Sequence, residues 1–154
     1  MLAAVHENSR DNGRTPMQWS NTDNAGFSQT QPWLQVNPNY PEINVDAALE
    51  DQHSIFYHYQ KLIQLRKSLP VIVHGTFEPV FEEHEQVFGY VRSDEQHRLF
   101  VLNNFTADEI TVAVPESLQT DQAECIIFNY ESHQQLSNTV TLKPYESFAV
   151  LLSA

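Results

Sequence analysis

The chain has 154 residues and a formal net charge of −12, from 20 acidic and 8 basic residues. Its length fits one domain, or a small domain with an appendage, and its 41% apolar content is enough for a core, which excludes a wholly disordered chain. The negative field repels phosphates, so a nucleic-acid partner is not expected, and no window has the apolar length of a membrane span.

The cysteine and histidine content indicates neither a disulfide nor a metal. Cys125 is the single cysteine, and Met1–Glu7 is too short and too polar for a secretory signal. A soluble cytoplasmic protein is therefore expected. No metal or other cofactor is expected, because the histidines are spread along the chain without the spacing of a zinc site. They are His6, His53, His58, His74, His84, His97 and His133.

The stretch from Asn8 to about Asn44 has no helical or strand period and is dense in turn-forming residues. It nevertheless carries large apolar side chains, which disordered linkers usually lack. These are Met17, Trp19, Phe27, Trp33, Leu34 and Tyr40. A loop of this length in a compact domain is normally functional or packed on another element.

The pattern between residues 44 and 69 is helical. Asn44 or Asp46 is predicted to cap a short first helix, and Ser54 is predicted to be the N-cap of a longer one. Apolar residues recur on one face of the longer helix, and Pro70 is expected to end it. The residues of this face are Ile55, Phe56, Tyr59, Leu62, Ile63 and Leu69.

After Pro70 the chain reads as short strands rich in β-branched and aromatic residues. In the run 110–114, Ile and Val alternate with Thr and Ala, which predicts a strand with one buried face; the run 99–102 is apolar on both faces and should lie centrally. The predicted strands are 71–73, 86–92, 99–103, 110–114, 124–130, 139–142 and 147–152. The fold class is thus mainly β with one or two helices: a C-terminal antiparallel β-sandwich preceded by an irregular loop segment and a helix.

Residues 9–19 read SRDNGRTPMQW. They resemble the SRDNxRTPMQW segment that follows the last barrel strand in α-glucosidases of glycoside hydrolase family 13, the group of oligo-1,6-glucosidases, trehalose-6-phosphate hydrolases and dextran glucosidases. Further blocks stand in the family's order, namely NAGFS, PWL, NY, INV and SIFYHYQKLI. The resemblance covers roughly Ser9 to Gly75, and the β-rich remainder matches in type only.

The resemblance implies two parts. Residues 1–69 would be a remnant of the C-terminal end of a (β/α)8 catalytic barrel, with the long helix as the last of its outer ring. Residues 70–154 would be the C-terminal β-sandwich domain. The loop segment would pack over the face of the barrel where active sites lie, and its apolar side chains would be buried there.

Retaining α-glucosidases need two carboxyl groups that flank the glycosidic bond. In the family these lie on barrel strands before the SRDNxRTPMQW segment, so no catalytic residue is assigned here, and the chain alone is expected to be inactive. The resemblance implies that Arg14 binds sugar hydroxyls of the terminal glucose in the intact parent, which suits its rigid fork of donors. Asp11 is placed at the same substrate site, although a purely structural pairing with Arg14 or Arg10 is the favoured role.

Two alternatives from other classes stay open. A stand-alone carbohydrate-binding module could hold oligosaccharide through exposed aromatics such as Tyr90 or Tyr145. A protein-interaction module could dock through the apolar helix face. Trp19 and Trp33 could stack on sugars, but packing against the barrel is favoured. Because the helix face is apolar, the isolated chain is expected to self-associate, and oligosaccharide is expected as a ligand only together with the barrel.

Overall fold

The computed structural model describes residues 10–120, 122–131 and 136–153. Ser9, His6 and His133, which entered the sequence argument, lie outside these residues. The chain divides into two compact units, Met1–Gln60 and Lys61–Ala154. The predicted boundary between a barrel remnant ending at residue 69 and a sandwich beginning at residue 70 stays a prediction.

The first unit is built mainly of irregular loop, as predicted. Its described elements are two short 3₁₀ turns, one short helix and the start of a longer one: η1 (Arg10–Gly13), η2 (Asp23–Gly26), α2 (Val45–Glu50) and α3 (Ile55–Ser68). Asn44 is the N-cap of α2, because its side-chain oxygen accepts a hydrogen bond from the Ala47 N–H at 2.9 Å. Of the two predicted candidates, Asn44 and Asp46, Asn44 is therefore the cap.

Ser54 stands directly before α3, and its backbone carbonyl accepts the His58 N–H at 3.1 Å. It therefore occupies the predicted N-cap position. Its hydroxyl, however, donates to the Ala48 carbonyl at 2.6 Å, so this side chain joins α3 to the preceding helix.

The prediction of a strand at residues 71–73 is wrong. The segment Pro70–His74 forms a short helix, α4, with Pro70 at its first position, where the fixed φ of proline suits a helix. The run Val-Ile-Val favours a strand locally, but a tertiary interaction decides the conformation.

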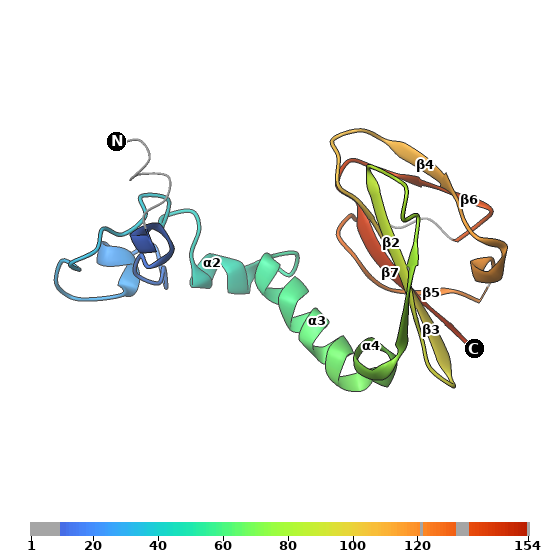
Figure 1. The fold of residues 1–154 in the computed structure, drawn as a ribbon. Coiled ribbons are helices and arrows are strands. Elements are labelled where there is room, and N and C mark those ends of the chain that lie inside the picture. The colour runs from blue at the N-terminus through green and yellow to red at the C-terminus, as the bar shows by residue number, and fades with distance from the viewer. Residues whose placement is uncertain (1–9, 121, 132–135, 154) are drawn as a thin grey trace. The chain divides into compact units, whose positions relative to one another are not determined.

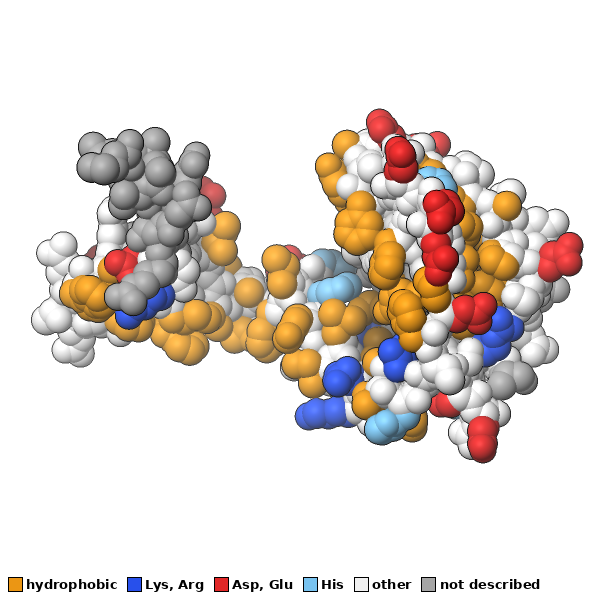
Figure 2. Space-filling model, in the orientation of Figure 1, with side chains coloured by type: hydrophobic (Ala, Val, Ile, Leu, Met, Phe, Trp, Pro, Cys, Tyr) orange, Lys and Arg blue, Asp and Glu red, His pale blue; other side chains and the backbone are white. Residues whose placement is uncertain are grey.

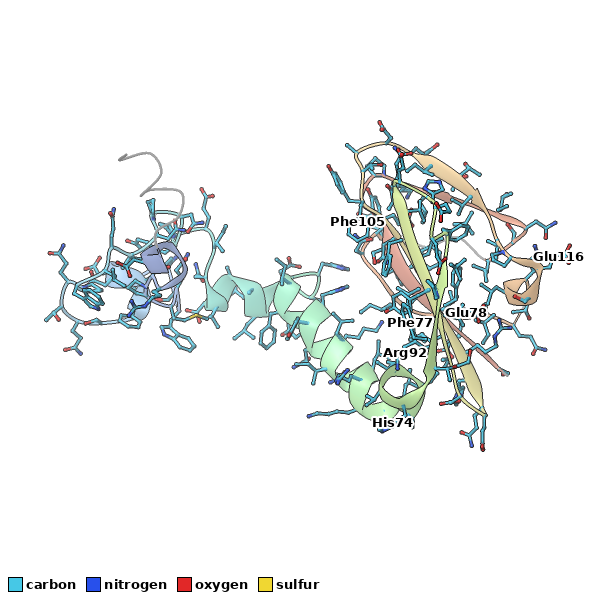
Figure 3. The ribbon with its side chains drawn as sticks, in the orientation of Figure 1. His74, Phe77, Glu78, Arg92, Phe105 and Glu116 are labelled. Atoms are coloured by element: carbon cyan, nitrogen blue, oxygen red, sulfur yellow. The ribbon has the colours of Figure 1, made fainter. Side chains whose placement is uncertain are left out.

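Arg92 provides that interaction. Its guanidinium donates to the carbonyls of Val71 at 3.1 Å, Val73 at 3.4 Å and Gly75 at 2.6 Å. Carbonyls at the end of a helix have no partner within the helix, and a cation there also interacts favourably with the helix dipole. Figure 3 shows Arg92 between the strands and α4. One side chain of the sandwich thus holds the end of α4.

The second unit contains an antiparallel β-sandwich, which confirms the predicted fold class. Five strands form one sheet in the order β1-β2-β3-β7-β5, and β4 pairs with β6 in a second sheet (Figure 1). The strands are β1 (Thr76–Val80), β2 (Val87–Ser93), β3 (His97–Asn104), β4 (Ile110–Ala113), β5 (Glu124–Phe128), β6 (Thr139–Leu142) and β7 (Ser147–Ser153). A 3₁₀ turn, η3 (Glu116–Leu118), follows β4.

The sequence did not predict β1. Glu78 and Pro79 are poor strand formers, and β1 lies at the edge of its sheet, which is where proline is tolerated. Two other expectations are confirmed. The apolar strand β3 is central, and in β4 Ile110 and Val112 are buried while Thr111 and Ala113 are exposed.

The five-stranded sheet has apolar side chains on both faces. One face meets β4 and β6 and forms the main core, in which Phe100 and Leu102 are fully buried. On the opposite face, Leu99 and Ala149 pack in a smaller cluster with Val71 of α4. We refer to this second face as the outer face of the sheet.

Candidate functional site

The two site residues inferred from the sequence lie together at the first turn of the described chain. The Arg14 N–H donates to the Asp11 carbonyl at 3.1 Å, which closes the 3₁₀ turn η1. The Arg14 guanidinium also pairs with the Asp11 carboxylate, Nη1 to Oδ1, at 3.2 Å. Their side chains are 49% and 44% exposed, so the guanidinium keeps donors free for a ligand. The predicted pairing of Asp11 with Arg14 is therefore observed, while the side chain of Arg10 lies outside what the structure describes.

Hydrogen bonds across the loop hold this segment in one conformation. Gln18 is central: its carbonyl accepts the Val45 N–H at 2.9 Å, and its side-chain amide donates to Asn39 Oδ1 at 3.0 Å. The next carbonyl, of Trp19, accepts the Asp46 N–H at 3.1 Å. The loop is therefore an ordered structure with the start of α2 as its base.

A tight left-handed turn shapes the middle of the loop. Asn24, Ala25 and Gly26 all have positive φ, and the Ala25 carbonyl accepts the N–H groups of Trp19 and Ser20. Gly26 has a φ of +65°, which glycine adopts most readily, and a Cβ at this position would meet Ser20 Oγ at 2.5 Å, so the serine hydroxyl would have to turn away.

The ordered loop presents its large apolar side chains at its surface. Trp33 is 82% exposed, and Trp19 is 50% exposed. Met17, Phe27 and Ile43 are exposed as well. Figure 2 shows hydrophobic side chains gathered over this segment with few charges among them. Monomeric proteins rarely expose such contiguous patches, which usually mark a site of interaction.

Helix α3 also exposes its apolar face. Ile55 is 86% exposed and Tyr59 is 64% exposed, and Phe56, Leu62 and Ile63 are exposed too. The exposed face fits either a chain that packs against further protein or a protein-interaction module.

No arrangement of a hydrolytic site is evident among the described residues. A shallow pocket of about 310 Å³ is lined by the β1–β2 hairpin and Phe105, and a wider, open depression by residues 22–29. Glu82, Glu83 and Glu85 beside the first pocket are exposed. His84 Nδ1 accepts the N–H groups of Gln86 and Val87, which gives it a role in the turn.

Within the described ranges, no three His, Cys, Asp or Glu side chains lie close enough together to hold a metal ion. In the same part of the chain, none of the helices combines the length and the apolar character that crossing a bilayer requires.

The two tyrosines of the carbohydrate-module alternative lie in different surroundings. Tyr90 on β2 is half-buried between Phe77 and Phe88, and burial raises the pKa of its hydroxyl, an effect that the nearby Arg92 partly offsets. Tyr145 is exposed in the turn before β7, at positive φ.

Family models match almost the whole described chain. The model of the α-amylase catalytic domain matches residues 1–75, and the model of the C-terminal domain of the α-amylase SusG matches residues 87–148. The first match ends directly before β1, and the second begins with β2. Residues 76–86 lie between the two matches.

The curated relatives belong to one group of enzymes. The chain is 45% identical over 152 residues to palatinase of Erwinia rhapontici, which is 99% of this chain and 28% of the palatinase. It is 40% identical to oligo-1,6-glucosidase of Bacillus cereus, of which it covers 27%, and 44% identical to trehalose-6-phosphate hydrolase of Bacillus subtilis, of which it covers 28%. It therefore spans just over a quarter of the length of these relatives.

Solved structures agree with this grouping. The crystal structure of trehalose-6-phosphate hydrolase from Bacillus licheniformis superposes with a TM-score of 0.90 and 36% identity, over 99% of this chain and 28% of that one. Isomaltulose synthase from Klebsiella sp. LX3 gives a TM-score of 0.89 at 32% identity, over 98% of this chain and 27% of that one. The chain belongs to the α-amylase family of glycoside hydrolases, family 13. Within that family it matches the α-glucosidase region that joins the end of the catalytic domain to the C-terminal domain.

One surface feature escaped the sequence argument. Phe77, Phe88 and Phe105 are exposed and, with Tyr90, form a continuous row of rings. The only local signal was the alternation in the FGYVR run of β2, which places Phe88, Tyr90 and Arg92 on one face. That signal does not show that β1 and the segment after β3 contribute rings to the same face.

Proposed function

We propose that this chain supplies the C-terminal part of a retaining α-glucosidase that acts on α-linked gluco-oligosaccharides, and that it is inactive by itself. One observation carries the proposal: an ordered loop presents Arg14 together with a surface of exposed Trp, Met and Phe side chains. Such a surface suits a segment that packs on the preceding part of the catalytic domain, and its relatives are glucosidases that extend well beyond the matched region.

In this proposal residues 1–69 complete the barrel and residues 70–154 form the sandwich domain. The match of the catalytic-domain model to residues 1–75 supports a catalytic part at this end of the chain, and it extends six residues past the boundary proposed at residue 69. Arg14 donates hydrogen bonds to hydroxyls of the terminal glucose, and Asp11 acts as a positioning residue, because its carboxylate fixes one edge of the guanidinium. The pair of carboxyl groups needed for glycosidic cleavage comes from the preceding barrel. The cytoplasmic location inferred from the sequence stays a prediction.

The test is hydrolysis of a chromogenic α-glucoside by the purified chain, alone and mixed with the preceding part of Bacillus cereus oligo-1,6-glucosidase as a separate polypeptide. We expect no turnover by the chain alone and turnover on mixing, because the carboxyl pair and Arg14 then share one site. The preceding part alone is the control. Turnover by the chain alone, after removal of contaminants, would contradict the proposal and place catalytic carboxylates within this chain.

The protein-interaction alternative is supported by the exposed face of α3, and the same face should cause the isolated chain to self-associate. We expect dimers or larger assemblies by light scattering, and their dissociation by Ile63→Gln with Phe56→Gln. A monomer at high concentration contradicts this expectation. If the chain binds a distinct protein in a fixed ratio but does not bind the barrel polypeptide, the interaction module is favoured over the glucosidase.

A further inference from the structure

The imidazole of His84 holds the turn between β1 and β2. Its Nδ1 accepts the N–H of Gln86 at 3.2 Å and the N–H of Val87 at 3.1 Å. The His84 N–H in turn donates to the carbonyl of Phe81 at 2.9 Å, and Phe81 has a positive φ of 66°. Turns ordinarily use Asn or Asp to accept backbone N–H groups a few residues ahead. Here a histidine, which titrates near neutral pH, takes that place.

This arrangement requires a neutral imidazole. A ring nitrogen that accepts hydrogen bonds carries no proton, so the proton of the neutral ring lies on Nε2. Protonation of Nδ1 would replace the acceptor by a donor that faces two other donors, and both bonds to the backbone would be lost. These bonds are thus present while His84 is neutral and are lost as the pH falls through the range in which histidines gain a proton.

Carboxylates of the same turn are the charged neighbours of His84. Glu82, Glu83 and Glu85 flank it, and their side chains are exposed. To the cavity that His84 lines, β1, β2 and the segment after β3 contribute only uncharged residues among those described, namely Pro79, Val80, Val87, Phe88, Gly89 and Phe105. The three carboxylates attract an imidazolium, whereas the two N–H groups repel it. A protonated His84 is therefore drawn out of its place in the turn.

The turn is connected to the strands on either side of it. Val87 is buried and begins β2, where it pairs with Asn104 of β3. The Gln86 carbonyl accepts the Phe105 N–H at 3.0 Å, which joins the turn to the segment after β3. In the described sheet β1 lies at the edge with β2 as its neighbour, so this turn is the short connection that keeps the end of β1 in register.

We propose that His84 is a pH-sensitive switch of the β1–β2 hairpin. The neutral imidazole closes the turn, and its protonation opens the turn and the adjoining end of β1 locally. The inference goes beyond the proposed function and does not depend on it. The strands β3 and β7 pair with each other independently of this turn, so the change is expected to stay local.

The test is amide hydrogen exchange and ¹⁵N NMR of the purified chain from about pH 7.5 to about pH 5, the range across which histidine titrates. Exchange rates are corrected for the intrinsic effect of pH. We expect the Gln86 and Val87 N–H groups to lose about tenfold in protection at the lower pH, because both lose their acceptor. The ¹⁵N signal of His84 Nδ1 reports its protonation, and the loss of protection should have the same midpoint.

His84→Asn is the matched variant, because an amide oxygen accepts the same two N–H groups and does not titrate. In this variant we expect the protection of Gln86 and Val87 to be equal at both pH values. His84→Ala removes the acceptor, so both amides should be weakly protected at either pH. His97→Asn, at the start of β3, is the control and should keep the wild-type pH dependence.

The same pH dependence in the wild type and in His84→Asn overturns the proposal, and so does full protection in His84→Ala at the higher pH. Separate midpoints for the imidazole signal and for the two amides overturn it as well. Should His84→Asn lack protection at both pH values, the wild-type titration decides alone: coincident midpoints support the switch, and separate midpoints contradict it.

Discussion

In an enzyme made by joining this chain to the preceding part of Bacillus cereus oligo-1,6-glucosidase, replacing Arg14 by lysine should lower kcat/KM for an α-1,6-linked gluco-oligosaccharide by about 100-fold. The guanidinium is rigid and offers donors to Asp11 and to sugar hydroxyls together, while an ammonium is a compact charge that cannot span both. The loss of charged hydrogen bonds of this kind corresponds to roughly 2–3 kcal/mol of transition-state stabilisation. Steady-state kinetics with wild-type and Arg14→Lys enzymes measure the effect.

Asp11→Asn separates positioning from direct binding. The amide keeps the shape of the side chain but removes its charge, so Arg14 is held less firmly and kcat/KM should fall by only about tenfold. Arg98→Lys is the control, because Arg98 donates to the Ser117 carbonyl, on a different part of the chain. A kcat/KM of Arg14→Lys within threefold of the wild type contradicts a role of Arg14 in sugar binding. A larger loss of kcat/KM in Asp11→Asn than in Arg14→Lys contradicts the assignment of Asp11 as the positioning residue.

Much of the fold could be predicted because it is encoded locally. The alternation of Ile110 and Val112 with polar or small neighbours reflects the two-residue period of a strand and predicted β4 with its buried face. The cap at Asn44 was predictable because its side chain accepts a hydrogen bond from a residue only three positions ahead, which is a local interaction. The ion pair of Asp11 and Arg14 belongs to the same class, because its partners are three positions apart in the sequence.

The failures of prediction involve contacts between distant residues. Val71 and Val73 favour a strand by local propensity, but the guanidinium of Arg92, 21 and 19 positions away, donates hydrogen bonds to their carbonyls at the end of a helix. The row of rings formed by Phe77, Tyr90, Phe88 and Phe105 could not be predicted either, because these rings come from β1, β2 and the segment after β3. Only the register of the strands brings Phe77 beside Tyr90 and Phe88 beside Phe105.

Replacing Arg92 by alanine should lower the free energy of unfolding of the isolated chain by about 2–4 kcal/mol. Three carbonyls at the end of α4 lose a charged donor. Val71 of α4 is fully buried, and without these bonds the helix no longer holds it firmly against the sheet. This is a large part of the stability of a typical domain, about 5–15 kcal/mol. Urea unfolding measures the loss.

Arg98→Ala is the matched control, since Arg98 is also a strand arginine but makes a single bond to the Ser117 carbonyl, and we expect it to cost at most about 1 kcal/mol. Arg92→Lys should fall between the two, because an ammonium cannot reach all three carbonyls at once. Hydrogen exchange locates the effect: the Gly75 N–H, which bonds to the Val71 carbonyl, should lose protection in Arg92→Ala before the strands do. If Arg92→Ala costs no more than Arg98→Ala, α4 is held by the apolar contacts of Val71 alone, and Arg92 is not what turns a strand-forming sequence into a helix.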